Sequence, residues 1–168
     1  MAIDARPLDQ RPAEVHPNYG LNYLGELLEV PMTLAGPVSV SLHVSSDCPD
    51  TDFVAKLVEV LPDGRAALLM DGVVRAMYCD GATEPSRLSD GEIVRIKIPV
   101  GQIHHTVAAG SRLRVDVSSS NFPRRARNTN SGNPVLARDT DADKRVARNT
   151  VHHGENTPSF AELLVLPN

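Results

Sequence analysis

Serine is the first residue type in this chain that could attack an ester or an amide. One well-defined nucleophile motif is Gly-x-Ser-x-Gly, in which the serine must sit on a strained turn between a strand and a helix. The sequence has no such pentapeptide, and the run Ser118-Ser119-Ser120 lacks flanking glycines. We therefore predict a polar strand end at this run and no catalytic residue in the chain. A triad on another fold stays open, although no spacing favours one.

Histidine is the residue type that could ligate a metal, and the chain has six: His16, His43, His104, His105, His152 and His153. His104 and His105 are neighbours in sequence, and so are His152 and His153. Within a strand, the two side chains of each pair would point to opposite faces. Metal-binding cupins use His-x-His followed by Glu, and that spacing is absent. We expect surface or hydrogen-bonded histidines and no metal or other cofactor.

Other ligand classes leave few signals. The chain has no Trp, three Tyr and three Phe, and Phe53 and Phe160 have apolar neighbours that predict core positions. Aromatic rings for stacking on sugars are therefore scarce. There is no glycine-rich phosphate loop, and Asp139, Asp141 and Asp143 lack the glycine and terminal Glu of an EF-hand.

Charge and hydropathy argue against several partners. The 168 residues carry a net charge of −4, and the basic run 124–127 is offset by aspartates downstream, so we expect no nucleic acid and no membrane as partner. Residues 1–12 lack the apolar core of a signal peptide. If Met1 is the natural start, the sequence predicts a cytoplasmic protein. Cys48 and Cys79 could form one bridge, but free thiols are our expectation.

Alternation with a period of two predicts the strands. It is clearest in residues 38–45, 94–100 and 112–117, where valine, leucine and isoleucine alternate with polar or charged residues. One core between two sheets should contain Val40, Leu42, Val94, Ile96, Val115 and Val117.

Turn residues divide these strands. Pro62-Asp63-Gly64 predicts a tight turn with Gly64 at positive φ, between a central strand at 53–61 and a returning strand at 66–70. Further strands are expected from Asp71-Gly72 to Tyr78 and over residues 160–166, and residues 137–151 hold a short helix or none. About eight strands and almost no helix predict an all-β sandwich or barrel. Residues 1–26 are predicted to be an extended lead-in, and residues 27–168 one domain.

Several motifs carry a family resemblance. They are Ser45-Ser46-Asp47-Cys48-Pro49-Asp50-Thr51-Asp52-Phe53, Val58-Glu59-Val60-Leu61-Pro62-Asp63-Gly64-Arg65, Asp71-Gly72-Val73-Val74-Arg75, Ser118-Ser119-Ser120-Asn121-Phe122-Pro123 and Arg127-Asn128-Thr129-Asn130-Ser131-Gly132. In this order they resemble the C-terminal domain of the X-prolyl dipeptidyl peptidase and cocaine esterase family of serine hydrolases, over residues 27–167. The resemblance implies a galactose-binding-like, jelly-roll β-sandwich. It also implies that the Ser-Asp-His triad lies in an α/β-hydrolase domain outside this chain.

The function that this resemblance implies is a non-catalytic domain that supports a hydrolase active site. Two alternatives stay open: a ligand- or carbohydrate-binding β-sandwich that works alone, and an enzyme with an unrecognised site. We expect an α/β-hydrolase catalytic domain or subunit as partner, and a homodimer is a further possibility. The expected interface is the loop 121–133, whose candidate residues are Arg124, Arg127, Asn128 and Asn130.

One charged residue lies within an apolar strand. Arg75 follows Val73 and Val74, and a buried arginine needs an acidic partner. Asp50 or Asp52, in the strand junction, is the expected partner; the alternative is that Arg75 faces solvent.

Overall fold

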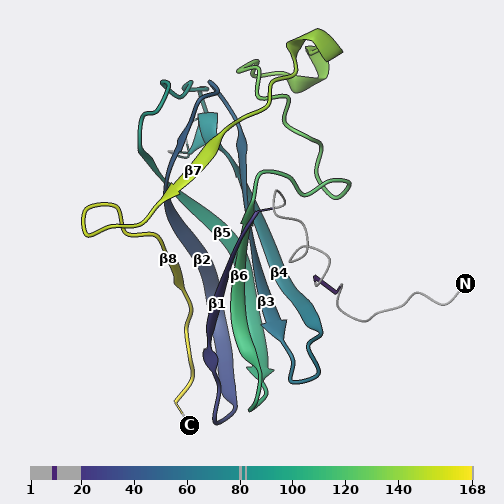
Figure 1. The fold of residues 1–168 in the computed structure, drawn as a ribbon, viewed down its shortest axis with the longest axis vertical. Coiled ribbons are helices and arrows are strands. Elements are labelled where there is room, and N and C mark those ends of the chain that lie inside the picture. Colours follow the sequence, from purple (N-terminus) through teal and green to yellow (C-terminus); the bar gives the residue numbers. More distant parts are fainter. Residues whose placement is uncertain (1–8, 11–19, 80, 82, 168) are drawn as a thin grey trace, which may run out of the picture.

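A computed structural model describes residues 9–10, 20–79, 81 and 83–167, and almost all of its regular structure is β-strand (Figure 1). The strands are β1 (Leu21–Leu27), β2 (Met32–Ser46), β3 (Asp52–Val60), β4 (Ala66–Arg75), β5 (Val94–Val107), β6 (Arg112–Ser118), β7 (Asn149–His152) and β8 (Phe160–Glu162). Three single turns of 3-10 helix, η1 (Ala76–Tyr78), η2 (Leu136–Arg138) and η3 (Asp141–Asp143), are the helical segments of this described part.

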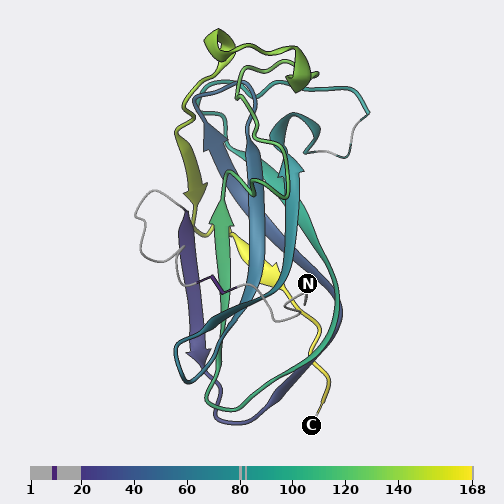
Figure 2. The same cartoon turned by 90° about the vertical axis from the view of Figure 1, so that its right-hand side faces the viewer.

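The strands form two antiparallel sheets that pack face to face (Figure 2). One sheet has the order β1-β6-β3-β4, and the other has the order β5-β2-β7, with β8 also paired to β2. β7 pairs with residues 43–46 of β2, whereas β8 pairs with residues 39–41, so two short strands share one edge of β2. This arrangement confirms the predicted all-β, jelly-roll sandwich with little helix.

The core between the sheets follows the alternation in the sequence. Val40, Leu42, Ile96 and Val117 belong to one buried cluster, and Val94 and Val115 pack against it. Arg95 and Lys97, which alternate with the buried residues of β5, are exposed. The predicted core is therefore confirmed, because strand side chains point to the two faces in turn.

The hairpin between β3 and β4 is also confirmed, with one correction. Gly64 has a φ of +82°, and its N–H donates to the carbonyl of Leu61 at 2.9 Å. The expected break at Asp71-Gly72 is wrong, since β4 runs through both residues to Arg75. A Cβ on Gly72 would lie 2.3 Å from the carbonyl oxygen of Pro99 in β5, so this glycine allows close packing rather than a turn.

The outer face of β6 is buried, although its residues are charged. Arg114 and Asp116 form a bidentate ion pair, with Nε–Oδ1 at 2.7 Å and Nη2–Oδ2 at 2.9 Å, and both are nearly inaccessible. Asn22 of β1 donates to Asp116, and the carbonyl of Gln10 lies 3.5 Å from Arg114. At Arg114 and Asp116, β6 is thus covered on both faces.

The two ends of the chain depart from the expected boundaries. β1 lies inside the segment expected to be a lead-in, but it pairs with β6 from Leu21 onward. The last strand is shorter than expected, and a single bridge from Leu34 to Val165 continues it. The predicted core position of Phe160 is wrong: the residue is 40% exposed, because β8 lies at the edge of its sheet.

Both cysteines are free thiols, with Cys48 buried and Cys79 half-buried. Burial is the first cause that raises the pKa of the Cys48 thiol, and the negative charge of Asp47 adds to it. Within the described residues, no helix is long and apolar enough to cross a membrane.

The core assignment can be tested at Ile96, which is 0% exposed. Replacing Ile96 by Ala removes buried methyl and methylene groups and leaves a cavity, so Ile96→Ala should lower the free energy of unfolding by about 2–5 kcal/mol. Val146 is 97% exposed, and the control Val146→Ala should change it by less than about 0.5 kcal/mol. Urea denaturation measures both, and equal small effects would contradict the assignment.

Candidate functional site

The serine run at the end of β6 is held by hydrogen bonds that serve structure. The hydroxyl of Ser118 donates to the carbonyl of Ser120 at 3.2 Å, and the hydroxyl of Ser119 accepts from Nδ2 of Asn149 at 2.7 Å. The N–H of Phe122 donates to the Ser120 hydroxyl at 3.4 Å. None of the hydrogen bonds in the described part joins these serines to a histidine, so the run resembles a polar strand end, as expected.

Three of the histidines have separate side-chain partners. Nε2 of His105 lies 2.8 Å from Oε2 of Glu59, Nε2 of His152 lies 2.9 Å from the Ser45 hydroxyl, and Nε2 of His153 lies 2.9 Å from the Tyr23 hydroxyl. No three His, Cys, Asp or Glu residues gather in a metal-binding arrangement within residues 9–10, 20–79, 81 and 83–167. His16 lies outside the described residues.

Glu59 is a buried carboxyl whose environment favours its charge. Burial raises its pKa, but hydrogen bonds from His105, Ser111 and the N–H of Ala108 outweigh burial and lower it. The three donors come from β5 and from the turn that follows it, so this carboxylate fixes the β5–β6 connection to β3.

A second buried carboxyl, Asp50, organises the opposite end of the sandwich. Asp50 is 0% exposed, and its Oδ2 accepts from Nε of Arg75 at 2.6 Å. Its Oδ1 accepts from the N–H of Met77 at 3.1 Å. Nδ2 of Asn128 donates to Asp50 at 2.9 Å and to Asp52 at 2.8 Å. Of the two partners expected for Arg75, the structure selects Asp50.

This network anchors the loop that was expected to be an interface. The guanidinium of Arg75 also donates to the carbonyls of Asn133 and Pro134, at 2.5 and 2.9 Å. Oδ1 of Asn128 accepts from the N–H of Asn130, whose φ of +58° is left-handed. Nδ2 of Asn130 donates to the carbonyl of Arg145. Asn128 and Asn130 therefore hold the loop in shape from inside.

Sequence reasoning missed the role of Asp139. The side chains of Thr129, Ser131 and Asn133 all donate to its carboxylate. The bond from Ser131 is the first cause that lowers the pKa of Asp139, followed by the bond from Thr129. The sequence did contain a signal for this cluster: Thr129, Ser131 and Asn133 stand at every second position. Side chains of these types often form hydrogen bonds with nearby groups in loops.

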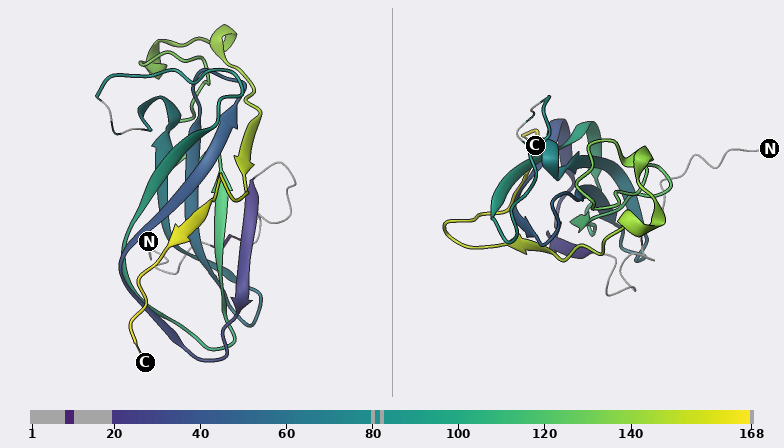
Figure 3. Two further views of the ribbon diagram at one scale, coloured as in Figure 1. Left: turned by 90° about the vertical axis from the view of Figure 1, so that its left-hand side faces the viewer. Right: turned by 90° about the horizontal axis from the view of Figure 1, so that it is seen from above.

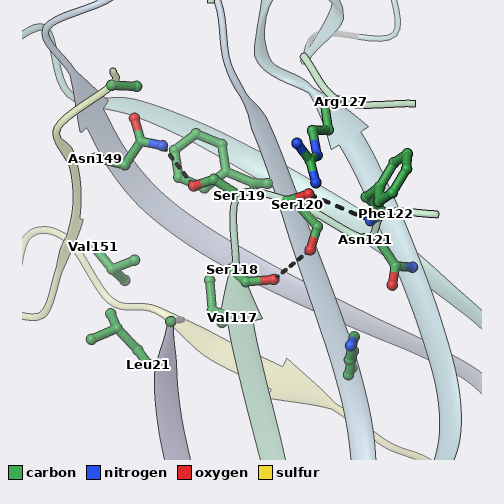
Figure 4. A pocket seen from close by; sticks show the side chains of 14 residues that line it. Leu21, Val117, Ser118, Ser119, Ser120, Asn121, Phe122, Arg127, Asn149 and Val151 are labelled. Atoms are coloured by element: carbon green, nitrogen blue, oxygen red, sulfur yellow. Dashed lines mark hydrogen bonds between the residues drawn. The ribbon is translucent and has the colours of Figure 1, made fainter. Parts of the chain in front are cut away.

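Beside this loop lies a groove of about 480 Å³ (Figure 4). Its lining residues come from the start of β1, the β3 strand, the end of β6 with the turn after it, and the β7 region. They are Gly20, Leu21, Phe53, Lys56, Val117, Ser118, Ser119, Ser120, Asn121, Phe122, Arg127, Ala147, Asn149 and Val151. Figure 4 shows Asn149 and Val151 on one side and Phe122 and Arg127 on the other.

The rim of the groove presents an aromatic ring with a cation on it. Phe122 is 57% exposed, and the guanidinium of Arg127 lies 4.4 Å from the centroid of its ring. Of the candidate interface residues, Arg124 and Arg127 are exposed. Arg124 forms an ion pair with Asp71, with Nη2 3.4 Å from Oδ1.

A second cleft, of about 340 Å³, opens between the sheets next to this groove. Its floor is apolar, with Val40, Leu42, Val115 and Val117. Tyr23, His153 and Phe160 also line it, and the rings of Tyr23 and His153 meet edge to face at 5.3 Å. Both depressions include Val117, so they share one side of the molecule.

The family model of the X-Pro dipeptidyl-peptidase C-terminal non-catalytic domain matches residues 18–162. The chain belongs to this family. The match to this PepX C-terminal domain covers both sheets and the groove.

Longer proteins contain the same PepX C-terminal domain. Cocaine esterase of Rhodococcus sp. (strain MB1 Bresler) is 42% identical over 164 residues, which are 98% of this chain and 28% of the esterase. An aminopeptidase from a marine sediment Thaumarchaeota archaeon has a TM-score of 0.91 and 26% identity over 96% of this chain. An α-amino acid ester hydrolase has a TM-score of 0.88 and 27% identity over 95%. The chain spans only 27–28% of each of these proteins.

Removing the charge of Asp50 and removing that of Asp52 should have different effects on the free energy of unfolding. Asp50→Asn takes the buried partner from Arg75 and should cost about 3–5 kcal/mol of unfolding free energy. Burial is the main cause that raises the pKa of Asp52, and the charge of Asp50 contributes. A raised native pKa means that Asp52 opposes folding at neutral pH and ceases to do so as the pH falls through that pKa.

Asp52→Asn should therefore leave the stability unchanged or slightly increased at neutral pH, and its difference from the wild type should shrink in acid. Urea denaturation across a range of pH measures both substitutions. A large loss with Asp52→Asn, equal to that with Asp50→Asn, would contradict this account.

The chain by itself should not hydrolyse esters or peptides, because it has no Gly-x-Ser-x-Gly motif and, within the described residues, the serines of the 118–120 run form no hydrogen bond to a histidine. A fluorophosphonate label, a p-nitrophenyl ester and a Gly-Pro anilide test this with the purified chain. We expect no labelled serine and no turnover above a heat-inactivated sample. Stoichiometric labelling of one serine together with turnover would show an unrecognised active site.

Proposed function

We propose that this chain supports a hydrolase active site by docking onto an α/β-hydrolase catalytic domain. The related proteins are about three and a half times as long as the matched region, which supports a catalytic partner in the same polypeptide or a separate subunit. The observation that carries the proposal is the face formed by the groove, Phe122 and the edge strands, where side chains suited to contact are exposed.

This face extends over one side of the sandwich, where β1, β7 and β8 lie along the open seam between the sheets (Figure 3, left). All seven residues of β1 are exposed, and β1 is an edge strand. Large apolar side chains exposed on β1, on β8 and on the segment after it are Leu21, Tyr23, Leu24, Leu27, Phe160, Leu164, Val165 and Leu166. Large apolar side chains exposed in such number on neighbouring edges are typical of a surface that another domain covers.

The position of β1 supports the same choice. Gly20 and Leu21, at its start, line the groove. A partner that covers the groove would therefore also meet the exposed edge strand β1.

Within the loop 121–133, we assign the direct contact to Arg127 and Phe122. Arg124 already pairs with Asp71, while Asn128 and Asn130 shape the loop. The homodimer expected from the sequence stays a prediction, and a second copy would compete for the same face.

Reconstitution of a split enzyme tests this proposal. The catalytic part of the Rhodococcus cocaine esterase, without its own C-terminal domain, is mixed with this chain, and sedimentation and light scattering measure binding. The esterase's own C-terminal domain, supplied as a separate chain, is the positive control. We expect this chain to form a one-to-one complex and to lengthen the half-life of the esterase activity on warming.

Binding of the control domain without binding of this chain would contradict the proposal. The same light scattering on this chain alone reports whether it forms a homodimer.

A further inference from the structure

Arg127 differs from Arg75 and Arg124 in having no ionic partner within the described residues. Arg75 pairs with Asp50, and Arg124 pairs with Asp71. Arg127 contacts the ring of Phe122, and it forms no hydrogen bond or ion pair within the described residues. Stacking on a ring occupies the face of a guanidinium and leaves the N–H groups at its edge available.

The surface that holds Arg127 is fixed in place. Nδ2 of Asn121 donates to Asp71 at 2.7 Å, and the N–H of Arg125 donates to the carbonyl of Asn121 at 3.0 Å. The N–H of Phe122 bonds the Ser120 hydroxyl. The ring of Phe122 is thus attached to a bonded turn, and the guanidinium on it loses less freedom when it binds a partner.

The groove beside Arg127 favours a negative group. Its charged lining residues are Lys56 and Arg127, and no carboxylate is among its lining residues, although the whole chain has a net charge of −4. Lys56 donates a hydrogen bond to Oε1 of Gln10 at 3.0 Å. Arg127, the other cation that lines the groove, donates no hydrogen bond to any described residue. A guanidinium edge matches a carboxylate, with two parallel N–H···O bonds.

The remaining walls favour a protein ligand. Leu21, Phe53, Val117 and Val151 provide apolar contacts, and the serines and asparagines provide hydrogen-bonding groups. Such mixed lining suits a peptide segment, in which a side-chain carboxylate alternates with backbone amides and apolar groups.

We infer that Arg127, stacked on Phe122, binds the carboxylate of an aspartate or glutamate on the docked catalytic domain. This inference rests on the proposed function, because the acidic segment belongs to the docking partner. Phe122 is the positioning residue: it orients the guanidinium and covers one face of the ion pair.

The split-enzyme assay tests the inference with three variants of this chain. Arg127→Gln should weaken binding of the catalytic part about ten-fold or more, Arg127→Glu should weaken it further by repulsion, and Arg127→Lys should fall between the wild type and Arg127→Gln. Because the lost contact is ionic, binding of Arg127→Gln should depend less on salt than binding of the wild type.

Arg65 supplies the control. It is also exposed, but it lies in the hairpin between β3 and β4 and lines neither the groove nor the second cleft. Arg65→Gln should bind like the wild type and keep its salt dependence. Thermal unfolding of each isolated variant checks for structural damage, and we expect Arg127→Gln to unfold within a few degrees of the wild type.

The possible results separate the two proposals. If the wild type binds and Arg127→Gln binds equally well with the same salt dependence, the carboxylate contact is wrong and docking stands. If Arg127→Gln and Arg127→Lys lose binding only in proportion to lost folding stability, Arg127 has a structural role and the inference is wrong. If the control domain binds and the wild-type chain does not, the docking proposal itself fails.

Discussion

The buried carboxylate of Asp50 is the constraint on which one end of this sandwich depends. A charge removed from water is costly unless it is paired and hydrogen-bonded. Asp50 meets this requirement with the Arg75 guanidinium, the N–H of Met77 and the amide of Asn128. The end of β4, the η1 turn and the long loop after β6 must therefore converge on it. The groove rim, with Phe122 and Arg127, belongs to the same loop.

Several charged groups of the domain form enclosed pairs, and Arg127 is placed differently. Glu59 with His105, Arg114 with Asp116, and Arg75 with Asp50 each bind strands or loops together. Arg127 instead has an aromatic support and a groove. Enclosed pairs are weak sources of stability but fix which segments meet, whereas an exposed stacked arginine is suited to recognition.

Local patterns in the sequence predicted the features that depend on one strand. The two faces of β5 followed from alternation, and the ion pair of Arg75 followed from a charge within an apolar strand. Features that depend on segments far apart in the sequence were either not predicted or predicted wrongly. Phe160 has apolar neighbours in sequence, but nothing local indicates that β8 lies at an edge. The burial of Arg114 depends on Gln10, about a hundred residues away, and the stacking of Arg127 on Phe122 depends on the shape of a loop.

The sharing of one β2 edge by β7 and β8 has a consequence for biosynthesis. β2 is complete by residue 46, yet these two partners begin at residues 149 and 160. In a nascent chain this edge of β2 therefore stays unpaired until residues 149–162 emerge from the ribosome, about a hundred residues after β2. Unpaired strand edges are sites of aggregation, so this stage is when the growing polypeptide most needs a chaperone. The second sheet can close only after β7 and β8 have emerged, and a chain cut short before residue 149 would keep this edge open.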